Sequence, residues 1–335
     1  MSKHYKLLFI GLSIVALLVA CGEQNNPKVQ STNSWSDSAN PPQHDPDLSV
    51  VSYLESSGPA TGVYLVDNFC YMTDAVGGLS IIDIHDQDEP LRHGSFSIAD
   101  AYRVSVYDNI AYLTGNFSGV KIVSVDHIDE PRLLASYGDT PAGDPVAVEN
   151  RLYVPVNGNL EILNVTDPYN PVFLGKYELG VTAWDLIVVD QYAGLALGSE
   201  GCVILDISDP ANIVEVSRLD LPGTASEIAS KDNFIYVACQ DAGLQILDVT
   251  DVNYPVLKGN FQTSSNAYGV SVQDNYAYLA TDTPGLVIVN VTDSAHPTYV
   301  KVLAHNSPSR DLAVAGNFVY VADNAKGLVV MKFKP

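Results

Sequence analysis

The chain has 335 residues, 47% of them hydrophobic, and carries 17 basic against 39 acidic residues for a formal net charge of −22. A surface this acidic repels a phosphate backbone, so the composition argues against nucleic-acid binding. Only 17% of the residues are charged, and 24 Gly and 19 Pro are present, which argues against a coiled coil or a long-helix bundle.

The N-terminal segment has the features of a secretory signal peptide. Lys3 and Lys6 precede an apolar run from Leu7 to Ala20, which is too short for a comfortable membrane span. The run ends in Leu-Val-Ala-Cys-Gly, which resembles a bacterial lipobox. The resemblance implies cleavage before Cys21 and attachment of acyl chains, such as palmitate, that anchor the protein to a membrane. The alternative is an ordinary cleaved signal peptide followed by an incidental cysteine.

The residues after this cysteine predict a location and a tether. Gly22 stands where Asp would favour retention in a bacterial inner membrane, so we expect the outer membrane or the cell surface. The following segment is polar, rich in Pro, Ser and Asn, and too poor in apolar residues to fold. The expected organisation is a lipoprotein signal peptide (1–20), a lipidated cysteine with a disordered tether (21–47) and a folded domain (48–335).

The folded domain repeats one sequence unit. The segment GLSIIDIHDQDEP, which begins at Gly78, returns in modified form at intervals of 40 to 42 residues. Upstream of each copy, as in residues 267–281, a β-branched run leads through a tight-turn signal such as Asp-Asn into a second run with Tyr. A further strand follows each Asp…Pro turn. Four short strands in about 42 residues are typical of a propeller blade. The units begin at Gly78, Gly119, Asn159, Gly201, Gly243, Gly285 and Gly327.

The two ends of the domain predict how the ring closes. Both faces of the repeated strands are apolar, as expected when each blade packs between two others. The last unit ends after its third strand, whereas residues 48–56 resemble the fourth strands elsewhere. We therefore predict an all-β, seven-bladed β-propeller of four-stranded blades, closed by an N-terminal strand that completes the last blade. A parallel β-helix is the alternative. The predicted blades are 57–98, 99–139, 140–179, 180–221, 222–263, 264–305, and 306–333 with 48–56.

The repeat also carries a family resemblance. GLxIxDVxDPxxP at about 42-residue spacing, with an upstream Asp-Asn or Gly-Asn turn and a Tyr, resembles the LVIVD repeat family of bacterial and archaeal exported β-propeller proteins. The resemblance covers residues 48–335, and it implies a propeller fold and a cell-envelope location but no settled activity. The departures are local, at Ser124, Asn164, Gly194 and Ile213.

Several repeated residues favour a structural role. The strand-end Asp or Asn, and the Asp three residues later, suit turns in which the side chain accepts backbone N–H bonds. A calcium site is the alternative for these residues, although an EF-hand loop is absent from the sequence. One Tyr in most blades is expected to pack between blades. Cys70, Cys202 and Cys239 lie in apolar runs and are expected to be small buried hydrophobic residues, with one disulfide as the alternative.

The positions at which the blades differ predict a binding site. The innermost strand of a blade lines the central channel, and the residues at its start differ in charge and size from blade to blade. We expect them to gather acidic groups, two arginines and three aromatic rings at one channel mouth, which suits a small molecule, a glycan or a peptide. The alternative is that the charges only solvate the mouth. The candidate binding residues are Tyr102, Arg103, Asp144, Trp184, Asp185, Glu227, Tyr268, Arg310 and Asp311.

Catalysis has little support in the sequence. The seven histidines lack metal-ligand spacing, and no nucleotide-binding or nucleophile motif is present, so neither a metal nor a cofactor is predicted. We expect a rigid extracytoplasmic binding platform, held on the membrane through Cys21, whose partner is an extracellular protein, peptide or glycan. The alternatives are a purely structural envelope component and a carbohydrate-active enzyme in which Asp185 and Glu227 face each other across the channel.

Overall fold

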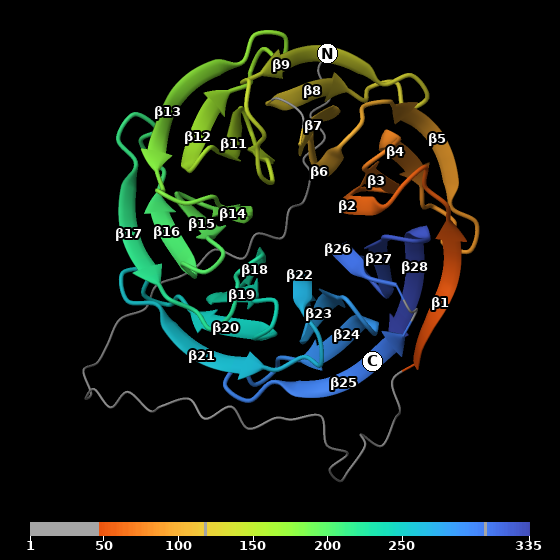
Figure 1. The fold of residues 1–335 in the computed structure, drawn as a ribbon, viewed down its shortest axis with the longest axis vertical. Helices are drawn as coiled ribbons and strands as arrows, with labels where there is room; N and C mark the ends of the chain where they lie inside the picture. The colour runs from red at the N-terminus through yellow and green to blue at the C-terminus, as the bar shows by residue number, and fades with distance from the viewer. Residues whose placement is uncertain (1–46, 117–118, 305–306) are drawn as a thin grey trace, which may run out of the picture.

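The computed structural model describes residues 47–116, 119–304 and 307–335. The predicted signal peptide, Cys21 and all of the predicted tether but Asp47 lie outside the described residues. Within them, seven antiparallel four-stranded sheets stand around a ring (Figure 1). The protein is thus an all-β, seven-bladed propeller, as predicted, and the alternative of a parallel β-helix was wrong.

Each blade runs from an innermost to an outermost strand in chain order, except the last. The first blade is β2 (Ala60–Val66), β3 (Phe69–Asp74), β4 (Gly78–Asp83) and β5 (Leu91–Phe96). The second is β6 (Ala101–Tyr107), β7 (Ile110–Gly115), β8 (Val120–Ser124) and β9 (Arg132–Tyr137). The third is β10 (Val146–Val148), β11 (Arg151–Val156), β12 (Asn159–Asn164) and β13 (Val172–Glu178). The fourth is β14 (Asp185–Val189), β15 (Tyr192–Ala196), β16 (Cys202–Asp206) and β17 (Val214–Leu219).

The remaining blades follow the same plan. The fifth is β18 (Glu227–Lys231), β19 (Phe234–Ala238), β20 (Leu244–Asp248) and β21 (Val256–Phe261). The sixth is β22 (Ala267–Gln273), β23 (Tyr276–Thr281), β24 (Gly285–Asn290) and β25 (Thr298–Ala304). The seventh is β26 (Ser309–Ala315), β27 (Phe318–Asp323) and β28 (Gly327–Lys334), with β1 (Asp47–Leu54) as its outermost strand.

The N-terminal strand closes the ring as predicted. β1 pairs antiparallel with β28, from Asp47 opposite Lys334 to Leu54 opposite Leu328. Leu48 is buried in a cluster with Phe333 and other residues of the sixth and seventh blades. The strand therefore covers an edge that would otherwise present unpaired N–H and C=O groups, and the two ends of the ring lie side by side (Figure 1).

The core lies between the blades rather than in one centre. Leu79 and Ile81 of β4 pack with Val104 and other residues of the second blade. Their neighbour Ile82 points the other way and packs with Tyr320 and other residues of the seventh blade. Because side chains alternate along a strand, a strand with two apolar faces can only be satisfied by a blade on each side.

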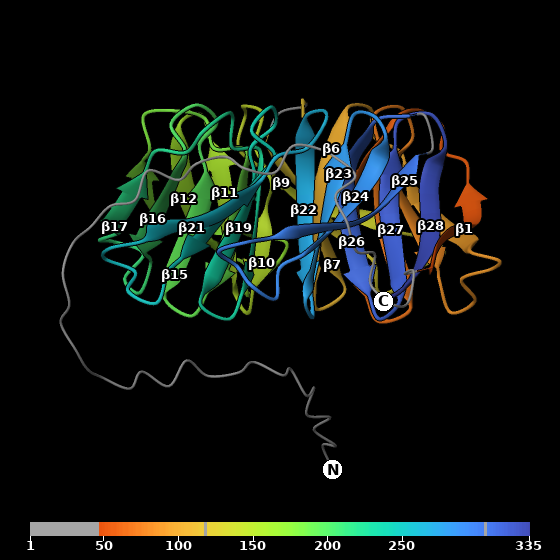
Figure 2. The same ribbon diagram turned by 90° about the horizontal axis from the view of Figure 1, so that it is seen from below.

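The strands run between two faces of the disc, seen edge-on in Figure 2. We call the face that carries the links from one blade to the next, such as residues 97–100 and 220–226, the connection face. The opposite face carries the Asp turns of the repeat, such as residues 84–90 and 249–255, and we call it the Asp-turn face.

The repeated Asp and Asn residues are turn residues, as predicted. The Asp83 Oδ1 atom accepts a hydrogen bond from the His85 backbone N–H (2.7 Å), and Asp86 accepts one from the Asp88 N–H (3.0 Å). Each bond satisfies a backbone donor that the strand leaves unpaired. The same pattern recurs at Asn164, Asp167, Asp206, Asp209, Asp248, Asp251, Asn290 and Asp293.

The repeated tyrosines and the cysteines are buried as predicted. The tyrosines at the repeated position are no more than 4% exposed and belong to the clusters between blades, and they are Tyr71, Tyr112, Tyr153, Tyr236, Tyr278 and Tyr320. Cys70, Cys202 and Cys239 are buried free thiols, so the alternative of a disulfide among them was wrong. Along the described ranges, no helix is long and apolar enough to cross a membrane.

Small residues on the outermost strands let neighbouring blades interlock. A Cβ atom on Gly175 of β13 would lie 1.8 Å from the Pro210 carbonyl oxygen in the next blade's Asp turn. At the corresponding position of the fourth blade, the Ser217 hydroxyl donates to the Val252 carbonyl oxygen (2.7 Å). Ser52 of β1 makes the same bond to the Gln87 carbonyl oxygen (2.7 Å). The outer strand of one blade is therefore fitted to the turn of the next.

Candidate functional site at the channel mouth

Five charged side chains meet at the start of the innermost strands. Asp185 and Glu227 are the first residues of β14 and β18, and Arg103 and Asp311 are the third residues of β6 and β26. Asp144 lies just before β10. Since all the innermost strands start from the connection face, these positions fall at one level of the channel, which we call the channel cluster. The structure thus brings together five of the nine candidate binding residues.

Arg103 is the cation of the channel cluster. Its Nε atom donates to Asp144 Oδ2 (2.8 Å), and its Nη1 atom donates to the Thr61 carbonyl oxygen of the first blade. Its Nη2 atom lies 4.0 Å from Glu227 Oε2, which is beyond hydrogen-bond distance. The guanidinium is thus held toward Asp144 and only faces Glu227.

Three carboxylates of the cluster tie neighbouring blades together. Asp185 Oδ2 accepts a hydrogen bond from the Ile228 backbone N–H (2.8 Å), and Glu227 Oε1 accepts one from the Val270 N–H (2.9 Å). In the same way, Asp311 Oδ2 accepts a hydrogen bond from the Val63 backbone N–H of the first blade (2.9 Å). The alternative in which Asp185 and Glu227 face each other across the channel does not fit this geometry, because they belong to the adjacent fourth and fifth blades and each bonds to the backbone of the next blade.

The cluster holds four carboxyl groups around the single guanidinium of Arg103. Burial raises the pKa of Asp185 to about 7, although the Ile228 N–H and Arg103 oppose the shift. Burial also raises the pKa of Glu227 well above its usual value, and Asp311 and Asp185 add to this by repulsion. Burial also raises the pKa of Asp144, because its effect exceeds the opposing effect of the Arg103 charge. The Glu227 Oε2 atom is buried and has no hydrogen-bond partner.

The other four candidate residues lie at the start of the innermost strands but outside the cluster, and Trp184 is the most exposed of them. The Trp184 side chain is 50% exposed. The Arg310 guanidinium lies 4.6 Å from the centre of the Tyr268 ring, and the Tyr268 hydroxyl donates to Asp282 Oδ2 (3.1 Å). The Tyr102 hydroxyl accepts a hydrogen bond from the side-chain amide of Asn116 (3.1 Å). The charged residues of the candidate site therefore meet in the channel, whereas the aromatic side chains contact loops of the connection face.

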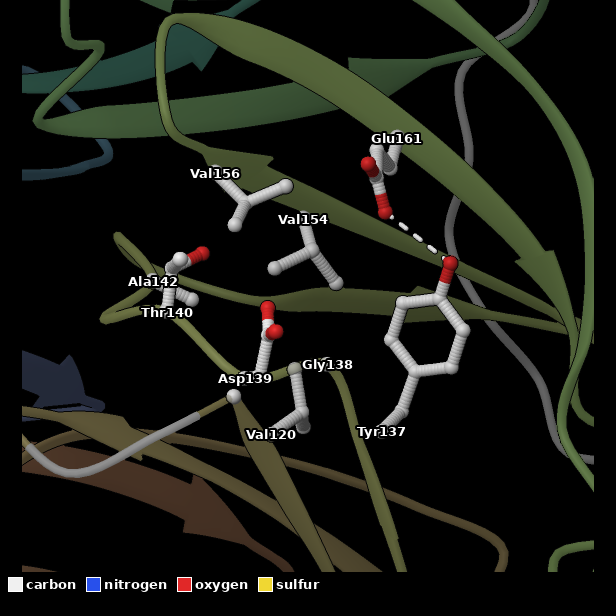
Figure 3. A pocket seen from close by; sticks show the side chains of 10 residues that line it. Val120, Tyr137, Gly138, Asp139, Thr140, Ala142, Val154, Val156 and Glu161 are labelled. Carbon is white, nitrogen blue, oxygen red and sulfur yellow. Dashed lines mark hydrogen bonds between the residues drawn. The ribbon is translucent and has the colours of Figure 1, made fainter.

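Sequence reasoning missed a second hollow on the connection face. A cavity of about 220 Å³ lies between the second and third blades, where Asp139, Val156 and Glu161 are among the residues that line it. The Tyr137 hydroxyl donates to Glu161 Oε2 (3.0 Å) across one side of this cavity (Figure 3). These residues vary between repeats, so the repeat pattern carried no signal for them. As for metals, the part of the chain that the structure describes has no group of three or more His, Cys, Asp and Glu suited to hold an ion.

These observations define the class of protein as a seven-bladed β-propeller whose channel mouth carries a charged cluster. The model of the LVIVD repeat matches residues 57–97, 180–220, 222–263, 264–303 and 308–331, more than half of the chain, so the protein belongs to the LVIVD repeat family. This confirms the family resemblance. The second and third blades, which carry Arg103 and Asp144, lie outside the matched segments.

Comparisons with individual proteins add information on the fold alone. No curated protein matches the sequence. The crystal structure of the computationally designed Ika8 protein is similar over 84% of this chain and 99% of that chain, with a TM-score of 0.64 and 10% sequence identity. A likeness at this level of identity extends to the architecture and not to any activity.

Proposed function

We propose that the protein is a lipid-anchored binding platform of the cell envelope, with the channel mouth on the connection face as its binding surface. The observation that carries this proposal is the half-exposed Trp184 side chain on the connection face, next in sequence to Asp185 of a channel cluster whose carboxylates are bonded to the backbone of the next blade. Exposed aromatic side chains on a rigid support contribute strongly to binding because little entropy is lost when they engage a partner.

The chemistry of the mouth favours an extracellular protein, peptide or glycan. Tyr268 and Trp184 offer ring faces, and Arg310, stacked on Tyr268, offers donors for carbonyl or hydroxyl oxygens. The net charge of −22 favours partners that carry positive groups.

Crosslinking in cells tests the binding surface. The double variant Trp184→Ala with Tyr268→Ala should lose the crosslinked partner recovered with the unchanged protein. The matched control is Tyr254→Ala, because Tyr254 is 78% exposed on the Asp-turn face, away from the channel mouth. Recovery of the same partner in equal yield from the double variant would exclude this surface.

Replacing Cys21 tests the anchor. The Cys21→Ser variant should leave the membrane fraction and lose incorporation of labelled palmitate, because no acyl chain can attach. Equal membrane association of the two proteins would support an ordinary cleaved signal peptide and a different means of attachment.

A carbohydrate-active enzyme is the alternative that the raised pKa of Asp185 and Glu227 favours, since a protonated carboxyl group can act as a general acid. Both Asp185 oxygens already accept backbone N–H bonds, from Leu186 (2.7 Å) and Ile228 (2.8 Å), which suits a structural role better. Turnover of a glycan that disappears in Glu227→Gln would support the enzyme, whereas no turnover across a broad glycan panel would reject it.

A further inference from the structure

Glu227 holds an unused acceptor in the channel. Its side chain is 9% exposed, and its Oε1 atom is fixed by the Val270 N–H, so the position of the carboxylate is determined by the backbone of the next blade. The second oxygen, Oε2, is buried without a hydrogen-bond partner. Leaving a buried carboxylate oxygen unpaired costs free energy, and such an atom in a folded protein calls for an explanation.

The internal cation does not supply the missing partner. Arg103 commits Nε to Asp144 and Nη1 to the Thr61 carbonyl oxygen, which leaves Nη2 at 4.0 Å from Glu227 Oε2. Asp144, Asp185, Glu227 and Asp311 all act on this one guanidinium. With four carboxyl groups around one positive charge, the cluster favours a second cation or bound protons.

Solvent reaches this level of the channel. The side chains of Arg103 and Asp144 are 23% and 18% exposed, although they lie beside the buried Glu227. The Glu227 Oε2 atom itself has no exposed surface, so a cation reaches it only when the Glu227 or Arg103 side chain shifts.

We propose that the channel mouth binds a primary ammonium group, as carried by the lysine side chain of a peptide or by a free polyamine, with Glu227 Oε2 as its principal hydrogen-bond acceptor. This inference rests on the proposed function and names the ligand chemistry of the same site. An ammonium group is compact and donates up to three hydrogen bonds, so it suits a narrow site with separate carboxylate acceptors.

Two other cations fit less well. A second guanidinium would be best held by a planar pair of acceptors, and in this cluster Asp144 Oδ2 already accepts from Arg103 Nε. A calcium ion needs six or more converging oxygens, whereas the Asp185 and Asp311 oxygens are turned to backbone N–H groups.

Ammonium binding should be coupled to proton release. The carboxyl groups of Glu227, Asp144, Asp185 and Asp311 share the cluster with Arg103, and burial raises the pKa of all four carboxyl groups. An incoming cation favours their ionised forms and displaces protons, so affinity should rise as the pH increases from 6 to 8.

The test is calorimetric titration of the full-length protein in detergent at pH 8 with two probes, spermidine and the peptide acetyl-Gly-Lys-Gly-amide. The control peptide carries norleucine in place of lysine. We expect the lysine peptide to bind and the norleucine peptide not to bind. The probe that binds more tightly identifies the source of the ammonium group.

Two substitutions locate the site. Glu227→Gln keeps an oxygen for the Val270 N–H and should weaken binding at least tenfold, whereas Glu200→Gln makes the same change at an exposed residue on the same face and should leave affinity unchanged. Thermal unfolding checks that both variants fold, and Asp144→Asn, which should also weaken binding, provides a second measurement.

Three results would overturn the inference. The first is that neither spermidine nor the lysine peptide binds. The second is that Glu227→Gln binds the probes with the same affinity as the unchanged protein, and the third is that the norleucine peptide binds as tightly as the lysine peptide. If crosslinking still captures a partner through Trp184 and Tyr268 in that case, the binding platform stands and only its ammonium chemistry is rejected.

Discussion

The Asp311 carboxylate of the last blade accepts a hydrogen bond from the Val63 backbone N–H of the first blade, with an Oδ2 to N distance of 2.9 Å. The ring is thus closed at two radii, by β1 against β28 on the outside and by this bond at the channel. The two residues lie 248 positions apart in the sequence, so the bond joins the ends of the domain.

Removing this inner closure should destabilise the ring. Asp311→Ala leaves the Val63 N–H without its acceptor, and we expect the free energy of unfolding to fall by about 1–3 kcal/mol. Asp311→Asn keeps one oxygen for that donor, so its free energy of unfolding should lie between those of Asp311→Ala and the unchanged protein. Chemical denaturation measures the difference. Asp139→Ala, which removes an exposed carboxylate from the same face, is the control and should change stability little; an Asp311→Ala variant as stable as this control would contradict the prediction.

The outer closure depends on Phe333, which is 2% exposed on β28. Its ring meets the rings of Tyr276 and Tyr278 edge-on, with centroid distances of 5.1 and 5.9 Å. Phe333→Ala should therefore cost about 3–5 kcal/mol of stability, because the cavity opens between the sixth and seventh blades. Tyr254→Ala, at a side chain that is 78% exposed in the Asp turn of the fifth blade, should shift stability by less than about 0.5 kcal/mol. Similar urea midpoints for the two variants would refute this account of the closure.

The sequence was sufficient to predict the architecture because the same strand and turn pattern recurs in every blade. Strands with two apolar faces, such as β4 with Ile81 and Ile82, require a blade on each side, and a last unit without its fourth strand requires a partner from the other end. The Asp turns followed from local chemistry alone, since Asp83 bonds to a residue only two positions away.

The details of the channel could not be read in the same way. Because Asp185 and Glu227 occupy equivalent positions in the repeat, the sequence predicted that they lie at one level of the channel. Whether such a carboxylate points to solvent or to the backbone of the next blade depends on the distance between blades. The acceptor role of Glu227 toward Val270 is a contact between residues 43 positions apart that no local pattern encodes. For the same reason the sequence predicted a binding site at the channel mouth but not the burial of Asp185 and Glu227 within it.

A further contact of this kind involves Gly175, which the sequence alone did not single out. Gly175→Ala should destabilise the protein by about 1–3 kcal/mol, because its Cβ atom would overlap the Pro210 carbonyl oxygen and force the third and fourth blades apart. The neighbouring change Lys176→Ala, on an exposed side chain, should have little effect. Thermal unfolding of both variants checks the prediction, which fails if the two melt together.

The channel cluster should make the protein less stable as the pH rises from 5 to 8. Burial raises the folded-state pKa of Asp185 to about 7, so the folded protein binds this proton more tightly than the unfolded chain does. The resulting stabilisation is complete below the unfolded pKa of about 4 and is lost as the pH rises through 7. Glu227 and Asp144, whose pKa values burial also raises, act in the same direction.

The Asp-turn face should act with the opposite sign at lower pH. The Ser208 hydroxyl and backbone N–H lower the pKa of Asp206, and bonds from His296 and the Ala295 N–H lower that of Asp293. Stabilisation by these groups is present above pH 4 and is lost as the pH falls through their folded pKa values. The melting temperature should therefore be highest near pH 5. Asp185→Asn should flatten the decline in melting temperature between pH 5 and 8, whereas Asp209→Asn should leave that decline unchanged. A melting temperature that rises steadily to pH 8 would show that the carboxyl groups of the channel cluster are not protonated in the folded state.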